Sequence, residues 1–142
     1  MFYLDTSFVI PLFINESTSE EVAAKLQAIP MDKIAISLWT KTEFSSVLAR
    51  KVRMQESTEQ FALKTISKFE QMMTNSCQVI IPEAADFDLS AQYIQHFQTG
   101  LRAGDALHLA IAKNHGAMSI YTLDVKLAKA ASLLNISCRL DL

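Results

Sequence analysis

The chain has 142 residues, a length that suits one domain and a hydrophobic core without covalent cross-links. Half of the residues are hydrophobic and 20% are charged, as in a packed globular protein. The formal net charge of −2 does not indicate a nucleic-acid-binding protein, although a local basic patch would be enough for such binding. No apolar run is long enough to span a bilayer, and the N-terminus lacks the basic segment of a signal peptide. We therefore expect one domain over residues 1–142, in the cytoplasm and without a membrane partner.

The two cysteines, Cys77 and Cys138, each lie in a short apolar run. Neither belongs to a Cys/His spacing that is typical of zinc sites. We expect two buried thiols in a reducing compartment rather than a disulfide or a metal site.

Short apolar runs alternate with longer helical patterns along the chain. The predicted strands cover residues 2–5, 34–37, 78–81 and 118–121, with a possible fifth at 137–140. The predicted helices cover residues 17–27, 38–54, 57–73, 83–97, 102–114 and 124–134. The strand runs are apolar without alternation, as in strands covered on both faces. Strands that alternate with helices imply crossover connections, so we predict an α/β fold with a mostly parallel sheet.

Local signals mark some helix ends. The segments Ser17-Thr18-Ser19-Glu20 and Ser57-Thr58-Glu59-Gln60 both have the form of a capping box. Gly116 follows the helix over 102–114, where glycine is typical of a C-cap.

Four acids lie at the ends of predicted strands or in the helices that follow: Asp5, Glu43, Asp105 and Asp124. The carboxyl ends of parallel strands share one edge of the sheet, and ligands bind in the crevice beyond that edge. These scattered acids therefore form a candidate site.

Each of these acids also has a purely structural interpretation. Asp5 is suited to cap a helix that begins after it, and its neighbours Thr6 and Ser7 are either ordinary caps or hydroxyls beside a ligand. Asp124 fits the first turn of a helix with Thr122 as its N-cap.

Glu43 fits the third position of a capping box that starts at Thr40. If the helix begins at Leu38 instead, Glu43 lies one turn into it and shares a face with Trp39 and Val47.

Asp105 is harder to explain by capping, because apolar residues cover most of the circumference of its helix. A buried carboxylate is costly unless it is paired or bound to a metal. Arg102, one turn back, is the main competing partner. His108, one turn on, is as consistent with a packed, hydrogen-bonded core histidine as with a functional one.

Four converging acids repel one another unless a cation neutralises them. An all-oxygen cluster suits Mg²⁺ or Mn²⁺ rather than zinc. We interpret Asp86, Asp88 and Asp141, which lie in less suggestive contexts, as solvated or capping residues.

The four acidic segments together resemble the PIN domain, and within it the VapC-type toxins of bacterial toxin–antitoxin pairs. The resemblance covers nearly the whole chain and rests on Leu4-Asp5-Thr6-Ser7, Thr42-Glu43, the run from Arg102 to Ala110 and Tyr121-Thr122-Leu123-Asp124. It implies a three-layer α/β/α sandwich whose four acids bind Mg²⁺ or Mn²⁺ in one pocket.

The function implied by the resemblance is hydrolysis of RNA phosphodiester bonds. Asp5 and Asp105 would hold the principal metal, and Glu43 and Asp124 would complete the cluster. Thr6, Ser7 and Thr122 would be supporting groups.

Candidate phosphate contacts are Lys41, Arg102, Lys126 and the segment Arg50-Lys51-Val52-Arg53, although we favour a solvated helix face as the explanation of the last segment. The family also implies a homodimer that a small antitoxin neutralises.

Two alternatives remain open. The first is a PIN-like module that binds RNA or protein without cleaving it. The second is a receiver-type or phosphatase-type domain in which Asp5 accepts phosphate. Ser7 stands where such phosphatases usually carry a second Asp, and Lys126 is only a loose match to a receiver lysine.

Overall fold

The computed structural model describes residues 1–140 and contains one five-stranded sheet in which all neighbouring strands are parallel. The strands are β1 (Phe2–Leu4), β2 (Ile34–Ser37), β3 (Gln78–Ile80), β4 (Ser119–Tyr121) and β5 (Cys138–Arg139). Their order is β3-β2-β1-β4-β5, so the first strand of the chain lies at the centre. The predicted α/β fold and all five predicted strands, including the last, are confirmed.

The helices are α1 (Thr6–Val9), α2 (Ser19–Gln27), α3 (Leu38–Arg53), α4 (Glu59–Asn75), α5 (Ala84–Gln95), α6 (Ala103–Asn114) and α7 (Val125–Leu133). Three short 3₁₀ turns are η1 (Ile10–Leu12), η2 (Met31–Lys33) and η3 (Phe97–Thr99). The sequence predicted that a helix begins after Asp5, and α1 confirms it, but the sequence did not predict the 3₁₀ turns η1 and η2. These turns are too short to show a helical period, and Pro11 lies within η1.

The cap predictions had mixed outcomes. Thr58 caps α4 by accepting a hydrogen bond from the Phe61 amide at 3.1 Å. Gly116, with φ +73°, ends α6 in the left-handed conformation that glycine favours. The predicted capping box before α2 was wrong, because Thr18 is the N-cap and its side chain makes no capping hydrogen bond. Ser19 Oγ instead accepts a hydrogen bond from the Glu16 amide at 2.9 Å.

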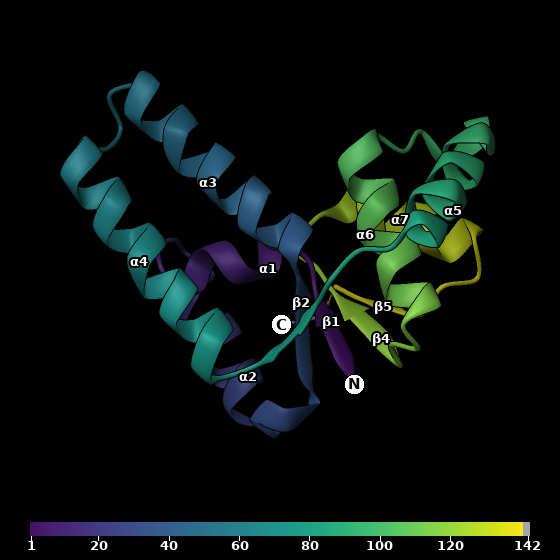
Figure 1. The fold of residues 1–142 in the computed structure, drawn as a ribbon, viewed down its shortest axis with the longest axis horizontal. Coiled ribbons are helices and arrows are strands. Elements are labelled where there is room, and N and C mark those ends of the chain that lie inside the picture. Colours follow the sequence, from purple (N-terminus) through teal and green to yellow (C-terminus); the bar gives the residue numbers. More distant parts are fainter. Residues whose placement is uncertain (141–142) are drawn as a thin grey trace.

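One face of the sheet packs against α1, α2, α3 and α4 (Figure 1). Leu4, Ile36 and Tyr121 point to this side and contact Phe8, Phe44 and other apolar side chains of those helices. The α3–α4 pair forms an antiparallel hairpin that extends beyond the sheet, at the upper left of Figure 1.

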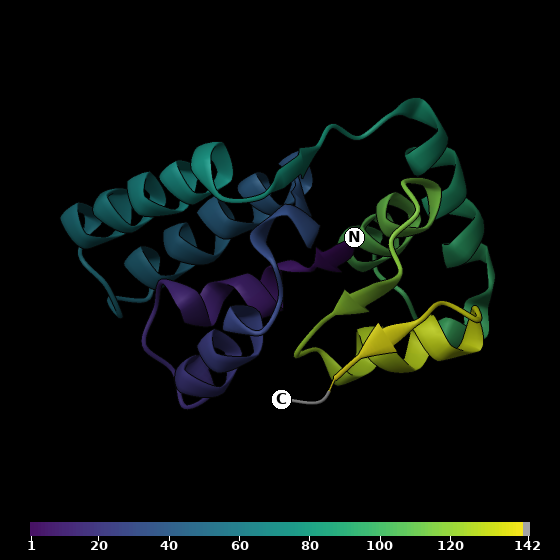
Figure 2. The same ribbon diagram turned by 90° about the horizontal axis from the view of Figure 1, so that it is seen from below.

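The opposite face packs against α5, α6 and α7, which lie together on the right of Figure 2. Tyr3, Ala35 and Ile120 belong to this second core, together with Leu109 of α6 and Leu127 of α7. Neighbouring strand residues thus enter different cores, because side chains alternate across a strand. Both faces are covered, which explains the unbroken apolar runs in the sequence and confirms the three-layer α/β/α sandwich.

Both cysteines are free and half-buried, and burial raises the pKa of each thiol to about 11. Among residues 1–140, no helix combines the length and apolarity that a membrane crossing needs. The interpretation of residues 1–142 as one domain stays a prediction.

Candidate active site

All four predicted acids line one pocket at the carboxyl edge of the sheet. The pocket has a volume of about 290 Å³ and is lined by Asp5, Thr6, Ser7, Ile10, Glu43, Ser46, Val47, Asp105, His108 and Asp124. The strand order explains this meeting. Asp5 follows the central strand β1, and α3 and Asp124 follow its two neighbours, β2 and β4.

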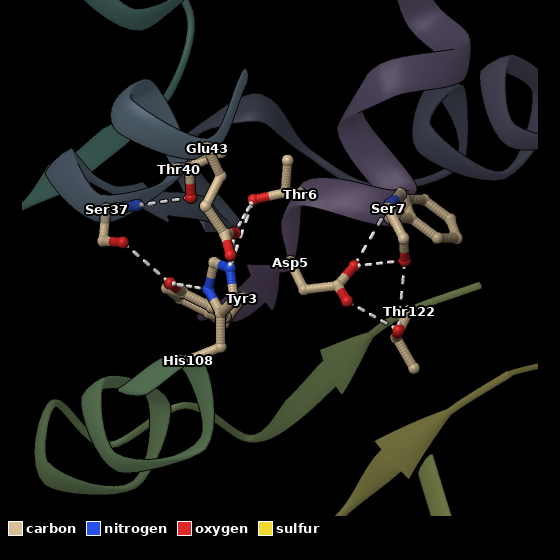
Figure 3. A network of polar contacts seen from close by, with 10 residues as sticks. Tyr3, Asp5, Thr6, Ser7, Ser37, Thr40, Glu43, His108 and Thr122 are labelled. Carbon is tan, nitrogen blue, oxygen red and sulfur yellow. Dashed lines mark hydrogen bonds and ion pairs between the residues drawn. The ribbon is translucent and has the colours of Figure 1, made fainter. Parts of the chain in front are cut away.

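Asp5 is buried and accepts hydrogen bonds on both carboxylate oxygens (Figure 3). Ser7 Oγ donates to Oδ1 at 2.7 Å, and Thr122 Oγ1 donates to Oδ2 at 2.7 Å. The Phe8 amide donates to Oδ1 at 3.1 Å, so Asp5 also caps α1. Burial raises the pKa of Asp5, and the attraction of His108 and these hydrogen bonds only partly oppose it.

Asp124 joins the site through the same hydroxyl groups. Its amide donates to Thr122 Oγ1 at 2.9 Å, and the Leu123 amide donates to Ser7 Oγ at 2.9 Å. Asp124 Oδ1 caps α7 by accepting from the amides of Lys126 and Leu127. The expected cap at Thr122 was therefore wrong: Asp124 is the N-cap, and the Thr122 hydroxyl holds Asp5 instead.

Glu43 lies on α3, which begins at Leu38 after a capping box between Ser37 and Thr40. The interpretation that places Glu43 one turn into the helix is therefore correct. Glu43 Oε2 accepts hydrogen bonds from Thr6 Oγ1 and, at 2.5 Å, from His108 Nε2. Burial acts to raise the pKa of Glu43, but the hydrogen bond and charge of His108, followed by Thr6, outweigh it and lower that pKa.

His108 is the residue whose role the sequence left undecided. Its side chain is 1% exposed, and its Nδ1 lies 2.7 Å from the hydroxyl of Tyr3, which lies 2.8 Å from Ser37 Oγ. The histidine is thus a hydrogen-bonded core residue and a neighbour of Glu43 at once. Its position one turn after Asp105 was the only sequence signal for this role, and nothing in the sequence paired it with Glu43.

Asp105 is half-buried in the first turn of α6. Burial raises its pKa, the charge of Asp124 raises it further, and Glu43 and Asp5 add to the effect. Arg102, the expected competitor, is exposed and forms no ion pair with Asp105 in the part of the chain that the structure describes. Asp105 therefore has negative neighbours and no basic partner beside it other than His108.

The chemistry of this donor set fits a hard divalent cation, because carboxylate oxygens from four side chains line one pocket. Within residues 1–140, no group of three or more acidic, histidine or cysteine side chains is arranged to hold a metal ion directly. An acidic pocket without three direct ligands still suits Mg²⁺, because Mg²⁺ is commonly held by one or two carboxylates and keeps several of its waters.

The remaining candidates lie in different places. Lys126 is exposed in the first turn of α7, next to Asp124. Lys41 pairs with Glu70 at 2.9 Å and lines a separate pocket between α3 and α4. Lys51 pairs with Glu56 at 3.6 Å. The interpretation of these residues as RNA contacts stays a prediction.

The acids set aside from the site also divide. Asp86 is fully buried in a capping box at the start of α5, so capping is confirmed and solvation was wrong. Asn114 Nδ2 and His115 Nε2 bond it at 2.8 and 3.0 Å. Asp88 is exposed, and Asp141 lies outside the described residues.

Comparisons with known proteins agree with this geometry. A family model described as "PIN domain" matches residues 2–133. A comparison with curated proteins finds no match.

Solved structures are similar over nearly the whole chain. VapBC2 from Rickettsia felis, bound to a DNA fragment from its promoter, is 17% identical, covers 98% of this chain and 98% of its own, and has a TM-score of 0.72. FitAcB from Neisseria gonorrhoeae is 18% identical, and the match covers 97% of this chain and 96% of the FitAcB chain with a TM-score of 0.70. VapC20 from Mycobacterium tuberculosis, a toxin that cleaves the sarcin-ricin loop, is 17% identical with 92% and 95% coverage and a TM-score of 0.68.

At these identities the solved structures establish the shared fold, while the family model spans most of the sequence itself. The four acids at one edge of a parallel sheet, the three-layer architecture and the match over residues 2–133 lead to one assignment: the chain belongs to the PIN domain family.

Proposed function

We propose that this protein is a metal-dependent endoribonuclease and the toxin of a toxin–antitoxin pair. The observation that carries the proposal is the convergence of Asp5, Glu43, Asp105 and Asp124 on one pocket at the carboxyl edge of the sheet. The likeness to VapC20, a toxin that cleaves an RNA loop, supports the choice of RNA as substrate.

The acids divide the work of holding a divalent cation, Mg²⁺ or Mn²⁺. Asp5 and Asp105 would hold it, while Glu43 and Asp124 would complete the cluster, directly or through water, and would orient the attacking water. When bound, the cation lowers the pKa of a coordinated water and stabilises the negative charge that develops on the phosphate.

Hydroxyl groups keep these carboxylates in place. Ser7 and Thr122 donate to the two oxygens of Asp5, and Thr6 donates to Glu43. Because these donors are fixed before a substrate arrives, the acids need little reorganisation when they act.

Three properties complete the proposal: a small antitoxin partner, a homodimer and a cytoplasmic location. A similar solved structure from Klebsiella pneumoniae is described as a toxin–antitoxin complex, which supports an antitoxin partner. The apolar side chains of Phe61 and Leu63 on α4 are 51% and 68% exposed, so this helix has apolar surface that a partner could cover. Light scattering that shows only a monomer at high concentration contradicts the dimer.

The test uses the purified protein and a mixture of cellular RNAs, with Mg²⁺, with Mn²⁺ and with a chelator. We expect new RNA 5′ ends with either cation and none with the chelator. Asp5→Asn should reduce cleavage at least about a hundredfold, because it removes a charge that the cation needs. Asp88→Asn is the matched control, since Asp88 is an exposed acid outside the pocket.

The same experiment separates the alternatives. RNA binding without new ends in any metal supports a non-cleaving PIN module. An Asp5→Asn protein that cleaves as fast as the parent contradicts the assignment of the site. Covalent labelling of Asp5 by a small phosphodonor would support a receiver-type domain, which the burial of Asp5 and the bonds on both its oxygens disfavour.

A further inference from the structure

The two oxygens of the Glu43 carboxylate lie in different surroundings. Oε2 accepts hydrogen bonds from Thr6 Oγ1 and His108 Nε2. Among the described residues Oε1 accepts no well-aligned hydrogen bond, although the buried indole of Trp39 lies close by and helps to lower the pKa of Glu43. Oε1 lies instead over Gly104 of α6, so close that a Cβ on this glycine would sit 2.7 Å from it. Oε2 is therefore anchored by two donors, whereas Oε1 is not anchored in this way.

His108 is built to anchor Oε2. The imidazole is 1% exposed, and contacts with the Tyr3 hydroxyl on Nδ1 and with Glu43 on Nε2 fix both ends of the ring (Figure 3). Tyr3 is itself held by Ser37 at 2.8 Å. A carboxylate can only accept, so Nε2 carries the proton whether or not the ring is charged.

Gly104 is unusual in a different way. It lies in the first turn of α6 with no positive φ, so its backbone conformation does not require glycine. Glycine costs about 1 kcal/mol relative to alanine inside a helix, and its use here needs another reason. The space that a Cβ would fill is occupied by Glu43 Oε1 and, at 3.3 Å, by Cζ2 of Trp39.

We propose that His108 and Gly104 are positioning residues for Glu43: His108 anchors Oε2, and Gly104 makes room for Oε1, which is the oxygen that takes the cation or its water. Both residues lie on α6, on either side of Asp105, so one helix sets the positions of two acids. The proposal rests on the proposed function for the role of Oε1. Neither residue needs to touch RNA.

The first test measures Mn²⁺ affinity of the metal-free protein by calorimetry. His108→Leu should weaken Mn²⁺ binding about tenfold or more, the usual effect of removing a partner that orients a metal ligand. His108→Gln, which keeps a donor, should recover part of the loss.

His115→Leu is the matched control for this test. His115 follows the same helix, and its Nε2 also bonds a carboxylate, that of Asp86 at 3.0 Å, outside the pocket. We expect both leucine variants to lower the melting temperature, but only His108→Leu to weaken Mn²⁺ binding. Equal Mn²⁺ affinities of the two variants overturn the role of His108.

The second test needs neither metal nor RNA. Gly104→Ala should lower the melting temperature of the parent by several degrees, because Glu43 is held by Thr6 and His108 and cannot yield freely. In a Glu43→Ala background the same change should be neutral or stabilising, since alanine is the better helix former. Equal shifts in both backgrounds overturn the role of Gly104.

The two tests also separate this proposal from the proposed function. A parent protein that neither binds Mn²⁺ nor cleaves RNA contradicts the proposed function and the role given to Oε1. The melting temperatures of the Gly104 and Glu43 variants then still decide whether Gly104 positions Glu43.

Discussion

Asp5 is held by donors from two distant segments of the chain. Ser7 and the Phe8 amide come from α1, and Thr122 comes from the end of β4, 117 residues further on. The same carboxylate caps a helix and lines the acidic pocket. The structural and functional interpretations of this residue were therefore never exclusive, because a cap needs only one oxygen and leaves the other for the site.

Thr122 should be worth more to stability than an ordinary buried threonine. It donates to Asp5 and accepts from the Asp124 amide, so Thr122→Val leaves two buried polar groups unpaired. We expect a loss of about 2 kcal/mol in the free energy of unfolding, measured by urea denaturation. Thr65→Val is the control, because Thr65 is equally buried but its hydroxyl only donates to the Phe61 carbonyl within α4. Equal losses contradict the prediction.

Asp86 and Asp105 occupy the same third position of their helices and should respond oppositely to pH. Burial opposes ionisation of Asp86, but bonds from the Glu83 amide, Asn114 and His115 lower its pKa. Burial and the Asp124 charge raise the pKa of Asp105. A carboxyl group whose pKa is lowered by folding stabilises the folded protein above its unfolded-state pKa of about 4, and this stabilisation is lost as the pH falls. A carboxyl group whose pKa is raised by folding favours the folded protein at low pH, and this stabilisation is lost as the pH rises.

From these signs, Asp105→Asn should stabilise the metal-free protein at pH 7, by about 1 kcal/mol, and the gain should vanish below about pH 4. Asp86→Asn should destabilise it at pH 7 by about 2 kcal/mol, and the loss should shrink in acid. Thermal unfolding between pH 3.5 and 8 checks both. A destabilising Asp105→Asn at neutral pH argues against a repulsive acid cluster.

At the scale of elements, the α3–α4 hairpin is joined to the body of the protein by aromatic packing. Phe44 of α3 and Phe69 of α4 stack with ring centroids 4.2 Å apart, and Phe13 meets both rings edge-on at 5.5 and 5.7 Å. Phe44, the residue after Glu43 on α3, belongs to this cluster.

Loss of that packing should be severe. Phe69→Ala removes a side chain that is 1% exposed and should lower the free energy of unfolding by about 3–5 kcal/mol. Leu63→Ala on the same helix should change it by less than about 0.5 kcal/mol, because Leu63 is 68% exposed. Chemical denaturation of the two variants measures the difference, and similar losses contradict the packing described here.

At the scale of the whole molecule, the proposed RNA substrate is a polyanion, whereas the protein has a net charge of −2 and an acidic pocket. Under that proposal, exposed basic residues close to the acids in the sequence would supply the attraction, and the candidates are Lys126, which follows Asp124, and Arg102, which precedes Asp105. Lys41 differs, because Glu70 already neutralises it.

We expect Lys126→Ala to weaken RNA binding and to reduce the slope of log affinity against log salt by about 1. Lys41→Ala should leave the slope nearly unchanged. Filter binding with a cleavage-deficient Asp5→Asn protein at several salt concentrations provides the measurement. A flat salt response of the parent contradicts a role for basic residues in RNA binding.

The sequence by itself determined the layers, the parallel sheet and the acids of the pocket. Unbroken apolar strands and alternating helices leave few architectures open, and parallel strands must end at one edge. Only the tertiary structure decided the partners of these acids. The His108–Glu43 contact, the approach of Glu43 to Gly104, the Thr122–Asp5 bond and the repulsion between Asp105 and Asp124 all join segments that are separate in the chain. Local patterns carry propensity and burial, whereas contacts between side chains depend on strand order and helix placement, which no local pattern encodes.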